Sequence, residues 1–250
     1  SSGLVDKLVH YPGEESQSAL LDIKVLADNV DVTNEVTIKV ESSDASVVVV
    51  DGLTLKVAEG ADGVAAVRVL VDGVEFKRFL VSAVDYEGLG YEKVSNKAEF
   101  LAMKGTGKYI LTADIDLEGD WLANTDSWRG LIQTLEADAV IDGNGHVVKN
   151  GKVASGWNNG WIENLKGTVK NIVFLNIDSP NTYPYATGLV GFGKGGTLEN
   201  IYLQYNILAD GEAGDVWKKA GTLIGCLETG HIKNCVVDFA DSNIENILQL

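Results

Sequence analysis

Cysteine, long apolar runs and positive charge are scarce in this chain of 250 residues. Its two cysteines, Cys226 and Cys235, are too few for a disulfide framework, and no further ligand stands near them at a metal-binding spacing. We interpret both as small core residues, with a disulfide between them as the alternative. The sequence holds no run of about 18 apolar residues, so we expect no direct insertion into a membrane.

Acidic residues outnumber basic ones by 36 to 20, which gives a formal net charge of −16. Because an acidic surface repels phosphate backbones, we expect no nucleic-acid partner. The same repulsion disfavours anionic membranes and strongly acidic polymers.

The composition changes near residue 85, and we therefore predict two domains, residues 1–85 and residues 86–250. Before that point, short valine-rich runs alternate with tight-turn dipeptides such as Asp51-Gly52 and Asp72-Gly73. Strands at this close spacing favour a small β-sandwich. All five tryptophans lie after it: Trp121, Trp128, Trp157, Trp161 and Trp217.

The stretch 42–73, SSDASVVVVDGLTLKVAEGADGVAAVRVLVDG, resembles the second half of a bacterial immunoglobulin-like domain of group 2. That family has a Ser-Ser-Asp turn, a valine-rich strand ending in Asp-Gly, a second strand, an Ala-x-Gly turn and a third valine-rich strand. The matching positions are Ser42, Ser43, Asp44, Val47, Asp51, Gly52, Ala58, Gly60 and Val67. The resemblance implies an immunoglobulin-like sandwich that acts as a spacer on a bacterial surface protein.

A single short helix is predicted over Val94–Lys104. Asn96 can cap its first turn, and Glu99, three residues later, completes a capping box. Gly105 and Gly107 end the helical pattern.

One phrase recurs three times in the second domain. The copies are GTVKNIVFLNID (167–178), GTLENIYLQYNI (196–207) and GHIKNCVVDFAD (230–241). Aligned on Asn171, Asn200 and Asn234, they are 29 and 34 residues apart. A repeat of roughly 20–50 residues with alternating apolar content is typical of stacked β coils.

The repeated asparagine predicts a corner between two strands of each coil. A corner residue adopts a left-handed or bridging backbone, which Asn tolerates better than other non-glycine residues. We expect Asn171, Asn200 and Asn234 to stack and form hydrogen bonds. The residues that follow them, Ile172, Ile201 and Cys235, should point inward. IDGNGHVVKN, which ends at Asn150, is interpreted as an earlier, less regular coil.

The second domain resembles right-handed parallel β-helix proteins of the pectate-lyase-like group, and more narrowly bacterial surface proteins with GLUG repeats. The family pattern is a helix, a Tyr-x-Leu-x-x-Asp-Ile-Asp-Leu strand and then Asp-Gly-Asn-Gly-His. The matching positions are Tyr109, Leu111, Asp114, Ile115, Asp116, Leu117 and the run Asp142 through His146. The resemblance implies an all-β chain: an immunoglobulin-like sandwich, then a right-handed parallel β-helix with a short N-terminal capping helix.

Catalytic motifs of β-helix pectinases are incomplete. Asn124-Thr125-Asp126 is present, but it precedes IDGNGH, whereas polygalacturonase-like enzymes place it afterwards. No Asp-Asp pair exists in the chain. His231 aligns with Thr168 and Thr197 of the repeat, so we interpret it as a stacked strand residue. We therefore predict no catalytic residue.

The segment DIDLEGD contains the one candidate for calcium, formed by Asp114, Asp116 and Glu118. It looks like the start of an EF-hand loop, but its twelfth position is Thr125 where that loop needs a bidentate Glu. We expect no metal and no cofactor, with calcium at this site as the alternative. His10 and His146 are interpreted as turn or surface residues.

The loops between coils carry aromatic residues in polar surroundings: Trp157, Trp161, Tyr183, Tyr185 and Trp217. If the loops emerge on one side, these rings could stack on sugar rings. The alternative is that they cover the flank of the coil as satellite core.

Together these features predict a non-enzymatic extracellular module of a bacterial cell-surface protein, secreted or held at the surface, that acts in adhesion or glycan binding. The expected partner is a neutral glycan or another host or cell-surface polymer, and the expected state is a monomer. Two alternatives stay open: a β-helix polysaccharide lyase or glycoside hydrolase, and a structural stalk. Clustered acids in a groove would favour the enzyme, and an aromatic strip would favour binding.

Overall fold

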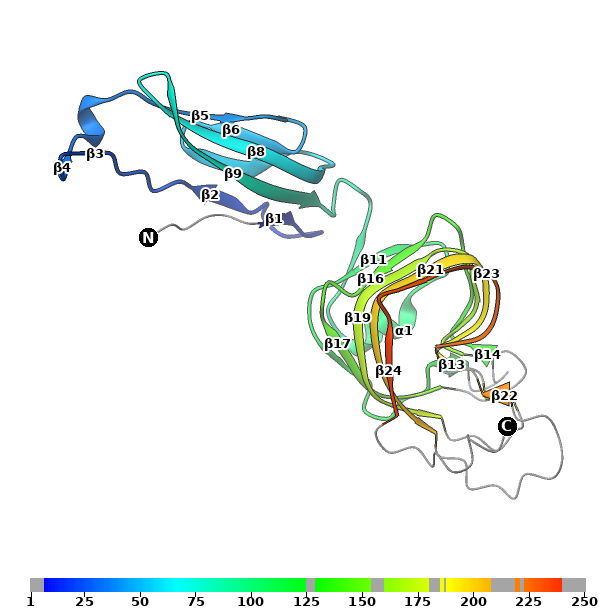
Figure 1. Cartoon of the computed structure of the whole chain (residues 1–250). Coiled ribbons are helices and arrows are strands. Elements are labelled where there is room, and N and C mark those ends of the chain that lie inside the picture. The colour runs from blue at the N-terminus through cyan, green and yellow to red at the C-terminus, as the bar shows by residue number, and fades with distance from the viewer. Residues whose placement is uncertain are drawn as a thin grey trace. The chain divides into compact units, whose positions relative to one another are not determined.

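The computed structural model describes residues 7–124, 129–153, 160–179, 185–186, 188–207, 219–220 and 223–239 (Figure 1). The chain divides into two compact units, Ser1–Glu92 and Lys93–Leu250. The division falls a few residues after the boundary that the change of composition indicates. Strands dominate both units, so the chain is all-β.

The first unit contains two sheets and a small ribbon. The larger sheet has the order β1 (Lys7–His10), β9 (Val74–Asp85), β8 (Asp62–Val71), β5 (Ile38–Ser42). The smaller sheet has the order β2 (Ser18–Leu20), β7 (Thr54–Val57), β6 (Val48–Asp51). A two-stranded ribbon, β3 (Leu26–Ala27) with β4 (Val30–Asp31), precedes the 3-10 turn η1 (Thr33–Glu35). Only β1 and β9 pair in parallel in the described part of this unit.

The two sheets of the first unit enclose one core. Alternate residues of β8, such as Ala65 and Val67, are fully buried, and they share a cluster with Val48 of β6 and Leu55 of β7. This alternation is what a strand with one covered face requires. The predicted turn at Asp72-Gly73 joins β8 to β9, and both of its residues have positive φ.

The helix α1 (Lys97–Ala102) follows β10 (Glu92–Val94) near the start of the second unit. It is shorter than the predicted Val94–Lys104 at both ends, because Val94 belongs to β10, Asn96 is the N-cap and Met103 is the C-cap. The Asn96 side chain accepts a hydrogen bond of 3.0 Å from the backbone N–H of Glu99. The Glu99 carboxylate reaches back to the backbone N–H of Ser95 at 2.7 Å. This reciprocal arrangement satisfies donors that a helix start leaves open.

The rest of the second unit is dominated by a long parallel sheet that curls partway round (Figure 1). Its main path runs β10, β11, β16, β19, β21, β18, β15. The bounds of its remaining strands are β11 (Lys108–Leu111), β12 (Ile115–Asp116), β15 (Ile132–Leu135), β16 (Val140–Asp142), β17 (Val147–Lys152), β18 (Ile162–Leu165), β19 (Thr168–Ser179), β21 (Val190–Ile207), β23 (Ile224–Lys233) and β24 (Val236–Asp238). Two short pairs lie outside it: β13 (Ala123–Asn124) with β14 (Arg129–Gly130), and β20 (Tyr185–Ala186) with β22 (Lys219–Ala220).

Equivalent residues of the repeat copies are paired in register along this sheet. We call each copy, together with the strand before it, a coil. Val169 of β19 is paired with Leu198 of β21, and Leu198 with Ile232 of β23. Further along the coil, Phe174 pairs with Leu203 in the same way. The members on β19 and β21 are fully buried, so the apolar columns of the repeat form the core of the unit.

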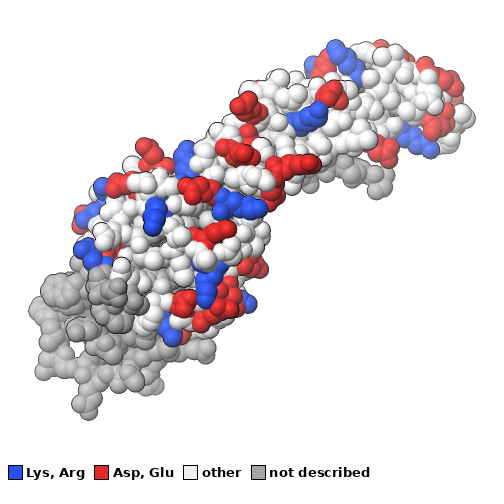
Figure 2. Space-filling view, turned by 180° about the vertical axis from the view of Figure 1, so that it is seen from behind, with Lys and Arg blue, Asp and Glu red and all other residues white. Residues whose placement is uncertain are grey.

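No helix in the described ranges is both long enough and apolar enough to cross a membrane. Acidic and basic side chains are interspersed over the visible face of each unit in Figure 2, with no broad basic area among the described residues. On this face the described charges of both signs are interspersed rather than gathered in one place.

Candidate functional site

The three repeated asparagines form a hydrogen-bonded ladder at one corner of the coil. Asn171, Asn200 and Asn234 all have left-handed backbones, with φ of 55°, 54° and 50°. The Asn200 side-chain amide donates to Asn171 Oδ1 at 2.8 Å, and the Asn234 amide donates to Asn200 Oδ1 at 3.2 Å. Beside them Ile172 and Ile201 are buried, and Cys235 packs against the same core at partial burial.

The ladder begins on a carboxylate. Asn171 donates to Asp142 Oδ1 at 3.1 Å, and Asp142 also accepts from the backbone N–H of Asn144 at 2.9 Å. Asp142 is almost completely buried, and the ammonium group of Lys170 lies 3.4 Å from its other oxygen. An ionised carboxylate accepts hydrogen bonds but donates none. Asp therefore suits the first position of the ladder, where no amide oxygen of an earlier member requires a hydrogen-bond donor. The ladder thus has a direction.

A second ladder runs along the next corner, and the sequence patterns did not predict it. The Asn150 amide donates to Asp116 Oδ1 at 2.9 Å, and Asn176 donates to Asn150 at 2.8 Å. Asn206 in turn donates to Asn176 Oδ1 at 2.8 Å. Asn150 therefore belongs to this second corner, and its position in the register is beside Asn176 rather than in the column of Asn171. This ladder also begins on an aspartate.

The calcium candidates are engaged in separate contacts. Asp114 accepts from the backbone N–H of Val147 at 3.0 Å and lies 3.1 Å from His146 Nδ1, and these contacts hold the pKa of Asp114 below its usual value. Asp116 begins the second ladder, and the amide of Asn150 lowers its pKa. Glu118 pairs with Lys97.

The three carboxylates Asp114, Asp116 and Glu118 thus satisfy different partners. Among the described residues, no group of three or more His, Cys, Asp or Glu side chains is placed to hold a metal ion.

The candidate catalytic residues do not gather around one point in the described part of the chain. Asn124 lies on β13 opposite Arg129, whereas Thr125 and Asp126 are outside the described residues. His231 is exposed on β23 and pairs with Thr197, as its place in the repeat indicates.

Arg129 makes a two-point ion pair with Glu163, with distances of 2.8 and 2.6 Å. Glu163 is buried and also accepts from the backbone N–H of Gly130 at 3.0 Å. The contact with Glu163 raises the pKa of Arg129, and the two-point pair fastens the β13–β14 ribbon to β18.

The aromatic loop residues are only partly described. Trp161 is fully buried, stacked on Phe100 at a centroid distance of 5.4 Å and edge-on to Phe174 at 5.5 Å. It therefore belongs to the core, and the expectation that its ring faces a ligand is corrected. Trp157, Tyr183 and Trp217 lie outside the described residues.

Two of the loops nevertheless meet. The backbone of Tyr185 on β20 pairs in parallel with Lys219 on β22, and Ala186 pairs with Ala220. The first of these short strands precedes β21 and the second precedes β23. Loops that enter successive coils are thus side by side at this flank.

His10 has partners that the sequence patterns missed. Its Nδ1 lies 2.8 Å from the buried carboxylate of Asp85, and its Nε2 lies 3.1 Å from Glu87. Asp85 also accepts from the backbone N–H groups of Gly60 at 2.7 Å and Gly88 at 3.0 Å. Burial opposes ionisation of Asp85, but these hydrogen bonds outweigh it and lower its pKa. The cluster ties the end of β9 to β1 and to the turn before β8.

Both cysteines are free thiols, as the interpretation required, but only one packs against the core. Cys226 is exposed, so its assignment to the core is wrong. It stands in the column of Asn164 and Phe192, whose members are themselves only partly buried.

Comparison of the chain with protein-family models, with curated proteins and with solved structures finds no match. Fold and site therefore stand on the geometry described above.

Proposed function

We propose that the first unit is an immunoglobulin-like spacer. We propose that the second is a right-handed parallel β-helix with GLUG-like repeats, and that α1 caps its N-terminal end. For the first unit, the support is a pair of sheets around a shared valine-rich core. For the second, it is the parallel register between equivalent residues of successive copies, such as Thr168 with Thr197 and Thr197 with His231.

We further propose that the chain is a non-enzymatic extracellular module of a bacterial cell-surface protein, and that its loop flank binds a neutral glycan. The observation that carries this proposal is the parallel pairing of Tyr185 with Lys219. Tyr183 and Trp217 each stand two residues before these paired positions. A continued register would bring a tyrosine and a tryptophan from two coils together.

Sugar rings suit such a platform for chemical reasons. Aromatic rings offer a large apolar face of the kind that stacks on pyranose C–H groups, while polar loop residues satisfy the hydroxyls. Adjacent coils are separated by about 4.8 Å, so rings on neighbouring loops fall within the span of one or two sugars. Because the protein carries a net charge of −16, it should prefer neutral or cationic sugars over uronates.

Screening on a glycan array, followed by calorimetry with the neutral oligosaccharides that bind, tests this proposal. Tyr185→Ala and Trp217→Ala should each weaken binding about tenfold, since the stacking of a sugar on one ring is worth on the order of 1 kcal/mol or more. Phe76→Ala is the matched control, because Phe76 is an exposed aromatic residue of the first unit.

Equal losses in Phe76→Ala, or full binding in the Tyr185→Ala Trp217→Ala double variant, would rule out the loop flank as the binding surface. Absence of binding to every neutral glycan would favour the structural stalk. Release of reducing ends or unsaturated products from pectin would favour the enzyme.

A further inference from the structure

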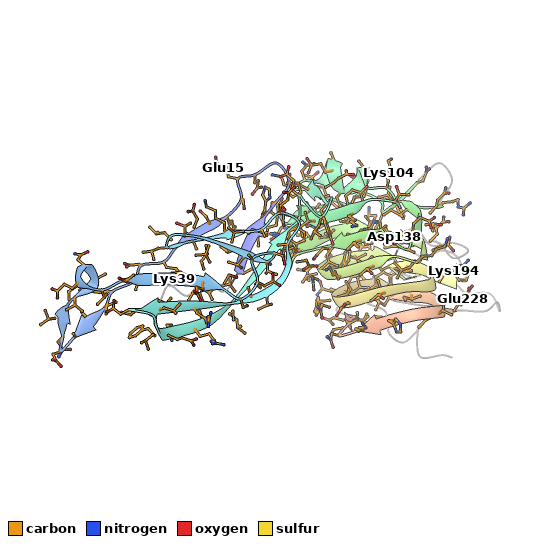
Figure 3. All side chains as sticks on the ribbon, turned by 90° about the horizontal axis from the view of Figure 1, so that it is seen from above. Glu15, Lys39, Lys104, Asp138, Lys194 and Glu228 are labelled. Atoms are coloured by element: carbon orange, nitrogen blue, oxygen red, sulfur yellow. The ribbon has the colours of Figure 1, made fainter. Side chains whose placement is uncertain are left out.

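The last described rung of the second unit lacks a neighbour on one side. In the described part of the chain, β23 and β24 pair only with β21 (Figure 3). Ile232 is 45% exposed, although Val169 and Leu198 of the same column are fully buried. Leu227 and Val236 of this rung are also exposed. The apolar column of Val169 and Leu198 thus continues to Ile232, on the last rung (β23 with β24), and no described strand covers that rung.

The ladder of Asn171, Asn200 and Asn234 reaches this rung with an unused acceptor. Each amide donates towards the preceding coil, and no described residue donates to Asn234 Oδ1. A side-chain amide on one more rung would continue the ladder by donating to this oxygen.

A column of charged residues indicates the sign of the charge that the next rung should have at one position. The residues that precede the corner are Asp142, Lys170, Glu199 and Lys233, which are paired in register and alternate in sign. The next member should therefore be acidic. The missing strand should read apolar, acidic, Asn, apolar.

Outside β18 and β21, which already contain this order at residues 162–165 and 198–201, one segment of the second unit has it. Ile244, Glu245, Asn246 and Ile247 repeat the order of residues 198–201, Leu-Glu-Asn-Ile. This segment lies outside the described residues. Asn246 follows Asn234 by 12 residues, whereas the other copies are 29 and 34 residues apart. It comes too soon to complete another coil of its own chain.

We propose that the edge formed by β23 and β24 binds the segment Ile244–Gln249 of a second copy of the protein as an added parallel rung. Asn246 of that copy would donate to Asn234 Oδ1, and its Glu245 would lie beside Lys233. The contact joins two different surfaces, so it is repeated head to tail from copy to copy and builds a ring or a chain. It replaces the monomer that we expected from the sequence.

Sedimentation velocity of the full chain over a wide range of concentration tests this proposal. The wild type should form species larger than the monomer as concentration rises. Lys233→Glu and Glu245→Lys should each weaken association about fivefold or more, because each places like charges side by side. The double variant, Lys233→Glu with Glu245→Lys, should restore it. Glu35→Lys and Lys77→Glu, at exposed sites of the first unit, are matched controls and should associate as the wild type does.

Circular dichroism of each variant establishes that it is folded before association is compared. A wild type that stays monomeric at every concentration overturns the proposal. This holds even if the two single charge variants are less stable and the double variant regains stability, because that pattern means that the segment folds back on its own chain. Association that neither single variant weakens overturns it as well. These outcomes are independent of glycan binding, which is measured on a different flank.

Discussion

Asn200 donates a hydrogen bond of 2.8 Å to Asn171 Oδ1, across 29 residues of sequence. Both residues have left-handed backbones. The pair therefore does two things at each corner of the coil. Its conformation turns the chain, and its side chains connect one coil to the next.

Replacement of Asn200 separates these two contributions. Asn200→Gly keeps the positive φ without strain but removes the amide, so we expect a loss of about 1 kcal/mol in the free energy of unfolding. Asn200→Leu adds the strain of a left-handed leucine and should lose about 2–3 kcal/mol. Unfolding in urea, followed by tryptophan fluorescence, measures this in the second unit, where all five tryptophans lie. Equal losses in the two variants would contradict the conformational role.

Asn171→Asp tests the direction of the ladder. The introduced carboxylate could not donate to Asp142, and two negative charges would face each other at a buried corner. Repulsion would raise the pKa of the introduced group above its unfolded value. The folded state would then bind more protons than the unfolded state, so the loss of about 2 kcal/mol at neutral pH should shrink as the pH falls towards 4. Asn34→Asp, at an exposed site of the first unit, is the control. A loss that does not depend on pH would contradict the assigned geometry.

Asp85→Ala should destabilise the first unit by about 2–3 kcal/mol, because two backbone N–H groups and His10 lose their acceptor. The pKa of Asp85 is lowered in the fold, so its contribution is present above the unfolded value near 4 and is lost as the pH falls below it. Hydrogen exchange of peptides from residues 7–85 reports this unit separately. Unchanged protection in Asp85→Ala would show that the cluster does not fasten β9.

Tyr205→Phe should flatten the alkaline loss of stability in the second unit. Tyr205 is fully buried, and burial raises its pKa to about 12. A tyrosine whose folded pKa lies above its unfolded value near 10 stabilises the fold below pH 10, and that contribution falls as the pH rises from 10 to 12. The wild type should lose about 2–3 kcal/mol more than the variant over this interval. Urea unfolding at several alkaline pH values measures the difference, and parallel curves would contradict it.

Part of this architecture could be predicted from the sequence because the repeat keeps a fixed order. Asn171, Asn200 and Asn234 share one column with no insertion around it, so the alignment of the three copies is enough to place them at a common corner. The capping contacts of Asn96 and Glu99 follow from local spacing in the same way.

The second ladder was missed for a physical reason. The pairing of β19 with β21 is irregular between Phe174 and Ile177. Asn176 therefore stands five residues after Asn171, whereas Asn206 stands six after Asn200. An alignment of the repeats does not place them in one column. Only the pairing in space connects Asn150, Asn176 and Asn206.

The burial of Trp161 could not be predicted from the sequence either. Trp161 directly precedes β18, and its backbone N–H bonds to the carbonyl oxygen of Leu189 in the next coil at 2.8 Å. It therefore lies within the stacked part of the unit, where its ring is packed against Phe100. A tryptophan that follows a polar loop does not by itself distinguish this position from an exposed one.

A double-mutant cycle on Asn171 and Asn200 tests the central claim, that the repeated phrase forms one corner of one coil and that successive corners are hydrogen-bonded. Asn171→Ala, Asn200→Ala and the double variant are compared by urea unfolding with tryptophan fluorescence. The strain of alanine at positive φ cancels in the cycle, so the coupling reports the contact. We expect a coupling free energy of about 1 kcal/mol. Losses that add to within about 0.3 kcal/mol would contradict the ladder and the stacking of the coils at this corner.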